Sequence, residues 1–317
     1  MTAAPLRVVF FGTPAFAVPV FDALLASRHR VVGVVTRPDR PRGRGHRTVD
    51  APVKARAREA GVPLLQPSSL SDPSFIAALA SLDADIGVVA AYGRILTERV
   101  LAMPRLGMIN VHASLLPRYR GAAPVHRAVI AGEPETGVTI MRVVKALDAG
   151  PMLAVSRRPI GPNETSEEVQ GDLARVGAAL LTLTLDRVAE GDVREAPQDD
   201  SAATYAHRIT KEDGLIDWTW PADRVHNLVR GLHPWPHAYT YAHGARLIIL
   251  RSALANQSRG DPPGSVVTAH GDELRIAAGS GAVDLLEIQA EGKRPMSPRD
   301  FLAGHRLRLG DRLARTP

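Results

Sequence analysis

Hydrophobic residues in the first half of the chain fall into short, β-branched runs that are separated by stretches of helical composition. This alternation of strands and helices predicts βαβ units, and therefore a mostly parallel, doubly wound sheet. Several of the predicted helices begin with proline, which fits the first turn of a helix. The predicted strands are 7–11, 31–36, 84–90, 108–112 and 138–144, and the predicted helices are 14–26, 51–60, 73–80 and 124–131.

A longer helix is predicted after Thr165, because Thr165 and Glu168 have the spacing of a capping box. Apolar residues then follow at alternating steps of four and three, which predicts one buried stripe. The stripe consists of Val169, Leu173, Val176, Leu180 and Leu183. The polar segment after this helix has little periodicity, as expected of an interdomain linker. We therefore expect a first domain over 1–189, a linker over 190–206 and a second domain over 207–317.

The second predicted domain has a different pattern. After Tyr239, short strand-like segments alternate with Gly and Pro turns, which predicts a small, OB-like β-barrel. The three Trp residues of the chain all lie in this part, where packing is their more common role. The predicted strands are 245–251, 264–268, 273–277 and 282–288.

The composition narrows the class of protein without changing this architecture. Hydrophobic residues make up 45% of the 317 positions and the formal net charge is +6, a balance typical of a globular chain. The sequence has no Cys, which excludes disulfides, Cys-ligated metal sites and a thiol nucleophile. No apolar run approaches the roughly 18 residues of a membrane-spanning helix. Because too few residues precede the first predicted strand for a secretory signal, we expect a cytoplasmic protein.

Three common nucleotide and metal motifs are missing from the sequence. The turn after the first predicted strand, Phe11–Pro14, holds one glycine where a dinucleotide-binding fingerprint has three. There is no phosphate-binding loop ending in Gly, Lys and Ser or Thr, and no pair of His residues spaced around a Glu. The sequence therefore disfavours a nicotinamide or flavin cofactor, ATP hydrolysis and zinc catalysis.

Polar side chains close the predicted strand 108–112. Asn110 and His112 are two residues apart, so both project from one face, at the carboxyl end where open α/β sheets bind ligands. This pair suits an acyl-type transfer, because an amide can hold a developing oxyanion while an imidazole handles charge or a proton. Asp148 follows the next predicted strand, and its carboxylate could orient the imidazole. The alternatives are an ordinary buried His and an ordinary turn Asp.

Two separated segments are strongly basic. Residues 37–47 contain five Arg and one Asp, and residues 292–317 contain seven Lys and Arg against two Asp. The first segment is rich in Gly and Pro and cannot form a core, but its guanidinium groups could bind phosphates or become ordered on RNA. Two separate basic segments favour an extended polyanion over a small phosphate. The alternative is a solvated loop in an Arg-rich protein.

The motifs, taken in order, resemble the methionyl-tRNA formyltransferase family over nearly the whole chain. The matching segments are 11–14 with Phe16, 38–45, 110–124, 135–141, 147–150, 211–218 and 234–236. The resemblance implies a formyltransferase Rossmann-like catalytic domain followed by a tRNA-binding β-barrel. It implies transfer of the formyl group of 10-formyltetrahydrofolate to the α-amino group of methionyl-initiator tRNA, giving formylmethionyl-tRNA for translation initiation and tetrahydrofolate. It also implies no metal or nucleotide cofactor. We expect no membrane partner, and we expect a monomer.

The resemblance assigns roles to individual residues. It implies that Asn110, His112 and Asp148 are catalytic and that Phe16 lines a methionyl pocket. The implied folate-binding residues are Tyr92, Arg94, Ile95, Leu96, Ser114, Leu115, Leu116 and Pro117. The implied tRNA-binding residues are Arg40, Arg42, Arg44, Arg47, Lys211, Lys293 and Arg294.

Ala113, Tyr119 and the segment 143–146 depart from the usual pattern of that family. The last is similar to sugar-nucleotide formyltransferases, which share the Asn, His and Asp set and are the main alternative. The Arg-rich segment 37–47 favours a tRNA substrate, since a sugar-nucleotide enzyme has no evident need of it. Further alternatives are a glycinamide ribonucleotide formyltransferase, which is typically a single domain, a formyltetrahydrofolate hydrolase, and a tRNA-binding module without catalysis.

Overall fold

The structure is a computed structural model that describes residues 3–39, 41–42, 47–48, 50–255, 260–305 and 307–316. The chain forms two compact units that interleave along the sequence. The segment 190–206, which we expected to be an interdomain linker, is grouped with the first unit by its contacts. The first unit comprises Met1–Pro124, Thr136–Arg158 and Gln170–Ala206, and the second comprises Val125–Glu135, Pro159–Val169 and His207–Pro317.

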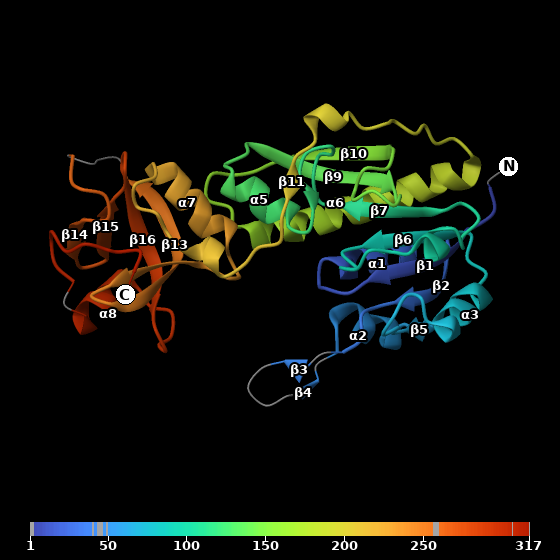
Figure 1. The fold of residues 1–317 in the computed structure, drawn as a ribbon, viewed down its shortest axis with the longest axis horizontal. Helices are drawn as coiled ribbons and strands as arrows, with labels where there is room; N and C mark the ends of the chain where they lie inside the picture. The colour runs from blue at the N-terminus through green and yellow to red at the C-terminus, as the bar shows by residue number, and fades with distance from the viewer. Residues whose placement is uncertain are drawn as a thin grey trace. The chain divides into compact units, whose positions relative to one another are not determined.

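The first unit is built on a seven-stranded sheet with the order β10-β9-β7-β6-β1-β2-β5 (Figure 1). The pairs among β1, β2, β5, β6 and β7 are parallel, whereas β9 is antiparallel to β7. The predicted mostly parallel, doubly wound sheet is therefore confirmed. The strands are β1 (Arg7–Gly12), β2 (Arg30–Val35), β5 (Leu64–Leu65), β6 (Ile86–Ala90), β7 (Met108–His112), β9 (Glu135–Arg142) and β10 (Met152–Pro159).

The order of the strands changes direction at β1. The chain builds β1, β2 and β5 outward on one side and then returns to place β6 and β7 on the other side of β1. Open α/β sheets bind ligands outside the carboxyl ends of their strands at such a switch point. The carboxyl ends of β6 and β7 therefore mark the edge of the sheet where a site is expected.

Helices cover the parallel strands, and the strands are accordingly buried on both faces, as in β1, where every residue after Arg7 is buried. The structure also has β10 and α4, which the sequence pattern did not predict. In β10 the residues alternate between partly buried and exposed and include two Arg, so its hydrophobic signal is weak. The helices that begin in the first unit are α1 (Ala17–Ala26), α2 (Pro52–Glu59), α3 (Pro73–Ser81), α4 (Glu98–Leu101) and α5 (Pro124–Ile130).

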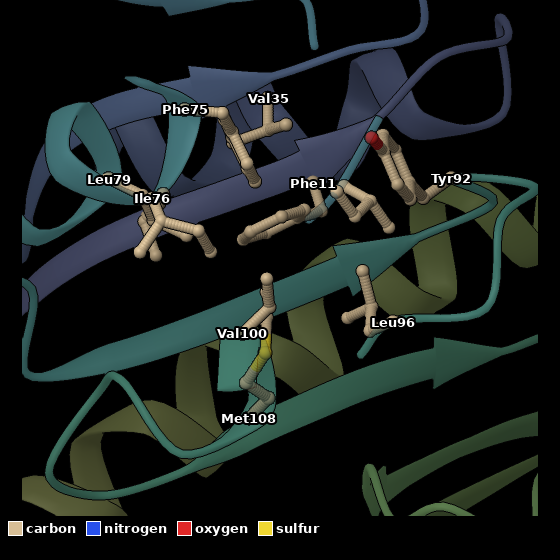
Figure 2. Close-up of a cluster of buried hydrophobic side chains, with 11 residues drawn as sticks. Phe11, Val35, Phe75, Ile76, Leu79, Tyr92, Leu96, Val100 and Met108 are labelled. Atoms are coloured by element: carbon tan, nitrogen blue, oxygen red, sulfur yellow. The ribbon is translucent and has the colours of Figure 1, made fainter. Parts of the chain in front are cut away.

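A cluster of buried apolar side chains joins β1, α3, β7 and the loop that follows β6 (Figure 2). The ring of Tyr92 packs edge-on against Phe11, with 5.5 Å between the ring centroids. Leu96, from the same loop as Tyr92, points into the cluster. Burial raises the pKa of the Tyr92 phenol and so keeps it neutral. This cluster fixes the start and the end of the 92–96 loop beside the carboxyl end of β6.

The long helix α6 (Ser166–Glu190) begins at the predicted capping box. The backbone N–H of Thr165 donates to Glu168 Oε2 at 2.8 Å, and the N–H of Glu168 donates to Thr165 Oγ1 at 3.3 Å. These two bonds satisfy donors that a helix start otherwise leaves unpaired.

The second half of the predicted stripe on α6 is wrong. Leu183 is 62% exposed, whereas Leu181 and Leu185 are fully buried. The buried face passes through Gly177, which lies close to Val111 of β7: a Cβ on Gly177 would be 2.8 Å from Val111 Cγ1. A glycine carries no hydrophobic signal, so the sequence pattern could not place this contact.

The second unit is built on a five-stranded sheet with the order β12-β13-β16-β15-β14 and antiparallel pairing. A segment after α8 bridges both edges: Arg312 pairs with Ser265 just before β14, and Ala314 pairs with Tyr241 on β12. The predicted second, β-rich domain is confirmed. Its elements are α7 (Ala222–Gly231), β12 (Ala238–Ala242), β13 (Ala245–Ala255), β14 (Val266–His270), β15 (Glu273–Ala277), β16 (Ala282–Ala290) and α8 (Pro298–Gly304).

Short elements complete the described chain. Two-stranded pairings join β3 (Pro41–Arg42) with β4 (Arg47–Thr48), and β8 (Arg120–Gly121) with β11 (Tyr205–Ala206). Two 3₁₀ turns lie at Asp200–Ala202 and Glu212–Gly214. None of the helices that the structure describes is both long and apolar enough to cross a bilayer.

Candidate active site

Asn110 and His112 lie in the last three residues of β7, an interior strand of the sheet. Asn110 is opposite Val89 on β6 and Met141 on β9, and His112 is opposite Thr139. Because the two residues are two positions apart in a regular strand, their side chains lie on the same face, as the sequence predicts. His112 is 5% exposed and Asn110 is half-buried. The strand thus presents a buried imidazole and a more open amide at its carboxyl end.

Both ring nitrogens of His112 face hydrogen-bond acceptors. Nε2 lies 3.0 Å from the backbone oxygen of Tyr119, and since a carbonyl only accepts, Nε2 must donate. Nδ1 lies 3.7 Å from Oδ2 of Asp148. The same carboxylate oxygen accepts a 2.8 Å hydrogen bond from the backbone N–H of Gly121. The structure therefore brings His112 and Asp148 together and fixes each of them by a backbone group from the loop after β7.

The backbone around His112 is strained. Tyr119 and Asp148 have φ values of 62° and 47°, in the left-handed region that side chains with a Cβ rarely adopt. Each such residue costs on the order of 1–3 kcal/mol and persists only where its surroundings hold it. Gly121, at φ 118°, can adopt its conformation because it has no Cβ. Strain of this kind concentrates at ligand-binding and catalytic sites.

The 114–117 stretch, expected to bind folate, forms a tightly bonded loop directly after β7. The Ser114 hydroxyl donates to the Arg118 carbonyl at 2.7 Å. Thr139, opposite His112 on β9, donates to the Ser114 carbonyl at 2.8 Å and accepts from the Leu116 N–H at 3.2 Å. Ser114 and Leu116 are buried, whereas Leu115 and Pro117 are partly exposed. The exposed members of this loop are the ones that can contact a ligand.

The 92–96 segment presents few of its side chains to solvent. Tyr92 and Leu96 belong to the buried cluster of Figure 2, while Ile95 is 81% exposed. The Arg94 guanidinium donates to the carbonyls of Pro67 and Ser68 at 3.0 and 2.9 Å, so it ties this loop to its neighbour. A role of these four residues in folate binding stays a prediction, with Ile95 as the most accessible contact.

Phe16 lies at the start of α1 and is 7% exposed, so it is close to fully packed. A place for it in a methionyl pocket stays a prediction. In the second unit, Lys211, Lys293 and Arg294 are all exposed, as a surface that binds a polyanion requires, and their role in tRNA binding also stays a prediction.

The Arg-rich segment lies partly outside the described residues. Arg40 and Arg44 are not described, and for Arg42 and Arg47 the structure describes only the backbone of β3 and β4. The described residues on either side of the gaps, Asp39 and Asp50, meet at one buried cation. Lys54 of α2, whose side chain is 5% exposed, pairs with Asp39 and, at 2.9 Å, with Asp50.

The charges at Lys54 reinforce one another. The hydrogen bond with Lys54 lowers the pKa of Asp39, and the bonds with Asp39 and then Asp50 raise the pKa of Lys54. A buried lysine with two carboxylate partners remains charged, so it holds the two carboxylates near each other. Lys54 therefore holds Asp39 and Asp50 close to each other.

Sequence reasoning did not identify the residues that support the pair His112 and Asp148. Gly121 could have been found from the sequence, since an isolated glycine in a polar loop suggests a special backbone conformation. The carbonyl of Tyr119 acts through the backbone, which the identity of the side chain does not report. Gln198, which bonds the loop of Asp148, lies in a segment without periodicity and carries no signal at all.

Within the ranges that the structure describes, no group of three or more His, Asp or Glu side chains is arranged to hold a metal ion. The polar groups that the structure gathers near the carboxyl end of β7 are the amide of Asn110, the imidazole of His112 and the carboxylate of Asp148.

Comparison with known proteins places this site in a family. The model of the formyl transferase family matches residues 6–185, and that of the formyl transferase C-terminal domain matches 208–306. A methionyl-tRNA formyltransferase of Roseiflexus sp. (strain RS-1) is 46% identical over 311 residues, which is 98% of this chain and 95% of that protein. The chain belongs to the methionyl-tRNA formyltransferase family. A second member of this family, from Sorangium cellulosum (strain So ce56), is 45% identical over 98% of this chain and 100% of its own length.

Solved structures agree with the formyltransferase fold. A crystal structure of WlaRD, a sugar 3N-formyl transferase in the presence of dTDP and 5-N-formyl-THF, superposes with a TM-score of 0.69. The match covers 91% of this chain and 99% of that one at 17% sequence identity. At this identity the likeness shows the fold alone. Together with the family models, it confirms the formyltransferase Rossmann-like sheet followed by a β-rich domain.

Proposed function

We propose that this protein transfers the formyl group of 10-formyltetrahydrofolate to the α-amino group of methionyl-initiator tRNA, giving formylmethionyl-tRNA and tetrahydrofolate. The observation that carries the proposal is the contact between His112 and Asp148 at the carboxyl end of β7. It occurs in a chain that is 46% identical, over 98% of its length, to a relative named for this activity. The product then serves translation initiation.

In the proposed reaction, the lone pair of the methionyl α-amine attacks the formyl carbon, which forms a C–N bond and leaves negative charge on the formyl oxygen. The Asn110 amide donates a hydrogen bond to this oxygen, and the protonated ring of His112 offsets its charge. A proton passes from the attacking amine to folate N10, the bond between N10 and the formyl carbon breaks, and tetrahydrofolate leaves. Asp148 and the carbonyl of Tyr119 hold the imidazole in place, so it does not need to reorient as the charge develops.

The folate donor is proposed to lie between the loops 92–96 and 114–117. Both loops follow a strand at the carboxyl edge of the sheet, after β6 and β7 respectively. The exposed Ile95 and the partly exposed Leu115 and Pro117 supply apolar surface. Such surface suits a pterin, because ligand pockets are mostly apolar with a few placed polar groups. Folate is a co-substrate here, and the proposal includes no metal or nucleotide cofactor.

The tRNA is proposed to contact basic residues in both halves of the chain. In this proposal residues 1–189 catalyse the transfer, 190–206 link the domains, and 207–317 bind tRNA, with Lys211, Lys293 and Arg294 among the contacts. Arg40, Arg42, Arg44 and Arg47 are proposed to contact the acceptor end, and Phe16 to contact the methionyl side chain. We further propose that the protein acts as a monomer in the cytoplasm.

Replacing both Arg42 and Arg44 by Gln is expected to raise KM for methionyl-tRNA and to flatten its dependence on salt. Each phosphate contact contributes about 0.7–0.9 to the slope of log affinity against log salt, so the slope should fall by about 1.5. The measurement is KM for tRNA at several salt concentrations, with KM for the folate donor as the internal control. An unchanged slope would contradict the proposed role of these two residues.

One competition assay tests the proposed reaction against its alternatives. Transfer from 10-formyltetrahydrofolate is measured with methionyl-tRNA, a UDP-linked amino sugar and glycinamide ribonucleotide as competing acceptors. We expect kcat/KM for methionyl-tRNA to exceed the other two on the order of a hundredfold or more. Product from a small acceptor alone would overturn the substrate while keeping the catalytic set. Formate released without any acceptor would indicate a hydrolase, and tRNA binding without transfer would indicate a binding module.

A further inference from the structure

The side chain of Gln198 connects the loop that carries Asp148 with the loop that follows β7. Its Nε2 donates two hydrogen bonds, to the backbone oxygens of Asp148 and Gly150, each at 2.8 Å. Its Oε1 accepts from Nε and Nη2 of Arg120 at 3.1 and 2.8 Å. Both donors and both acceptor positions of the amide are therefore used. Gln198 lies 50 residues after Asp148 in the sequence, within the segment that we expected to be a linker.

The same segment also holds the loop that supplies the acceptor of His112. The Tyr119 N–H donates to Thr204 Oγ1 at 2.9 Å, and the Arg120 N–H donates to the Thr204 carbonyl at 2.8 Å. The pairing of β11 with β8 continues this contact to Gly121. Arg120 is 4% exposed, so its bonds to Gln198 form away from bulk water. Residues 198–206 thus hold Tyr119 and Asp148, which contact His112, and Gly121, which bonds the Asp148 carboxylate.

These hydrogen bonds stabilise two residues whose backbone conformation is unfavourable. Tyr119 and Asp148 adopt left-handed conformations, which they would leave if local preference alone decided. Hydrogen bonds to the carbonyl of Asp148 and to the N–H of Tyr119 act directly on the two strained peptide units. The restraint on the position of the Asp148 carboxylate therefore comes from outside its own loop.

We propose that Gln198 is a positioning residue for formyl transfer, which acts by holding the Asp148 carboxylate at its distance from His112. The inference rests on the proposed catalytic roles of these two residues. It assigns a task to the 190–206 segment beyond joining two domains. Because misplacement of a reacting group by about 1 Å can cost about a hundredfold in rate, a residue that touches no substrate can still set kcat.

Two substitutions of Gln198 test its hydrogen bonds in different ways: one removes them, and the other replaces the amide by a charged carboxylate. Gln198→Met keeps the approximate size and removes the hydrogen bonds, and we expect it to lower kcat about tenfold. Gln198→Glu keeps the bonds to Arg120 but turns an oxygen toward two carbonyl oxygens, and we expect it to lower kcat about thirty- to a hundredfold. KM for tRNA and for the folate donor should change less than about twofold, since neither substrate contacts Gln198 in this scheme.

Ser201→Ala is the matched control from the same segment. Among the residues that the structure describes, the Ser201 hydroxyl bonds only Asp199, at 2.6 Å, so its loss leaves the contacts with Asp148 and Arg120 in place. Its kcat and melting temperature should equal those of the wild type. A loss of kcat in Gln198→Met that is matched by a loss of folded protein, or that also appears in Ser201→Ala, would overturn the proposal.

A double-mutant cycle with Asp148→Asn tests whether Gln198 acts through Asp148. If it does, Gln198→Met should change kcat of Asp148→Asn by less than about twofold, because coupled groups are not additive. Additive losses would overturn the inference and leave the catalytic role of Asp148 intact. An Asp148→Asn variant with wild-type kcat would instead overturn that catalytic role, and the inference with it.

Discussion

Replacement of His112 by Ala is expected to lower kcat for formyl transfer by about a thousandfold, which corresponds to about 4 kcal/mol of lost transition-state stabilisation. The imidazole is 5% exposed, faces Asp148 through Nδ1 and donates to the Tyr119 carbonyl through Nε2. Its removal takes away the group that offsets the developing negative charge and leaves the carboxylate of Asp148 with the Gly121 N–H but without the imidazole. The measurement is single-turnover formyl transfer with both substrates saturating.

Binding of tRNA and of the folate donor should change little in His112→Ala, because the proposed contacts of both substrates lie elsewhere. His270→Ala provides the control, since this histidine is exposed at the end of β14 and has no part in the proposed chemistry. A His112→Ala protein that transfers formyl at the wild-type rate would remove this residue from the mechanism. Equal losses in the two variants would point to a general effect of removing an imidazole.

A second large effect is expected for Gly121→Ala, in both stability and rate. The backbone has φ 118° at this glycine, and an added Cβ would lie 2.9 Å from the Ala206 carbonyl oxygen. The combined strain and contact should lower the free energy of unfolding by about 2–4 kcal/mol. Relief of the contact moves the Gly121 N–H away from Asp148 Oδ2, so we also expect kcat to fall about a hundredfold. Urea unfolding and kcat at a temperature where the variant is folded measure the two effects.

Gly61→Ala is the matched control for that experiment. Gly61 also has a positive φ, 64°, but nothing lies within 4 Å of the position of an added Cβ. This variant should lose about 1 kcal/mol of stability from backbone strain alone and keep its kcat. If Gly121→Ala lost no more stability than Gly61→Ala and kept its rate, the close contact with Ala206 would have no role at the site.

The fold was predictable where the hydrophobic pattern was regular. Met108–His112 and Glu273–Ala277 form strands with the predicted bounds, because each is a short β-branched or alternating run between turn residues. The pattern failed where polar residues occupy structured positions. The strand Met152–Pro159 includes Arg157 and Arg158 and has one exposed face, and α7 (Ala222–Gly231) has a buried Arg230 that bonds the carbonyl of Glu164.

The candidate site was predictable in its side chains and not in its supports. Asn110 and His112 could be paired from their spacing alone, because a strand places residues two apart on one face. Asp148 lies in the loop after β9, a strand antiparallel to β7, and its distance from His112 depends on the tertiary structure of that loop. The side chains of Thr139 and Gln198 bond the backbone of the surrounding loops, and the backbone N–H of Gly121 donates to the Asp148 carboxylate. Such bonds depend on backbone positions that no local pattern encodes.

The segment that bridges both edges of the C-terminal sheet has a consequence for handling the protein. The Ala314 backbone exchanges two hydrogen bonds with Tyr241, at 3.0 and 2.8 Å, while the Leu313 N–H donates to Gly264 at 2.8 Å. Without these residues β12 and β14 would present unpaired backbone groups, and open strand edges promote association between copies of a chain. Truncations or affinity tags that disturb residues 312–316 would therefore expose these strand edges and promote self-association. An N-terminal tag is the safer choice for purification.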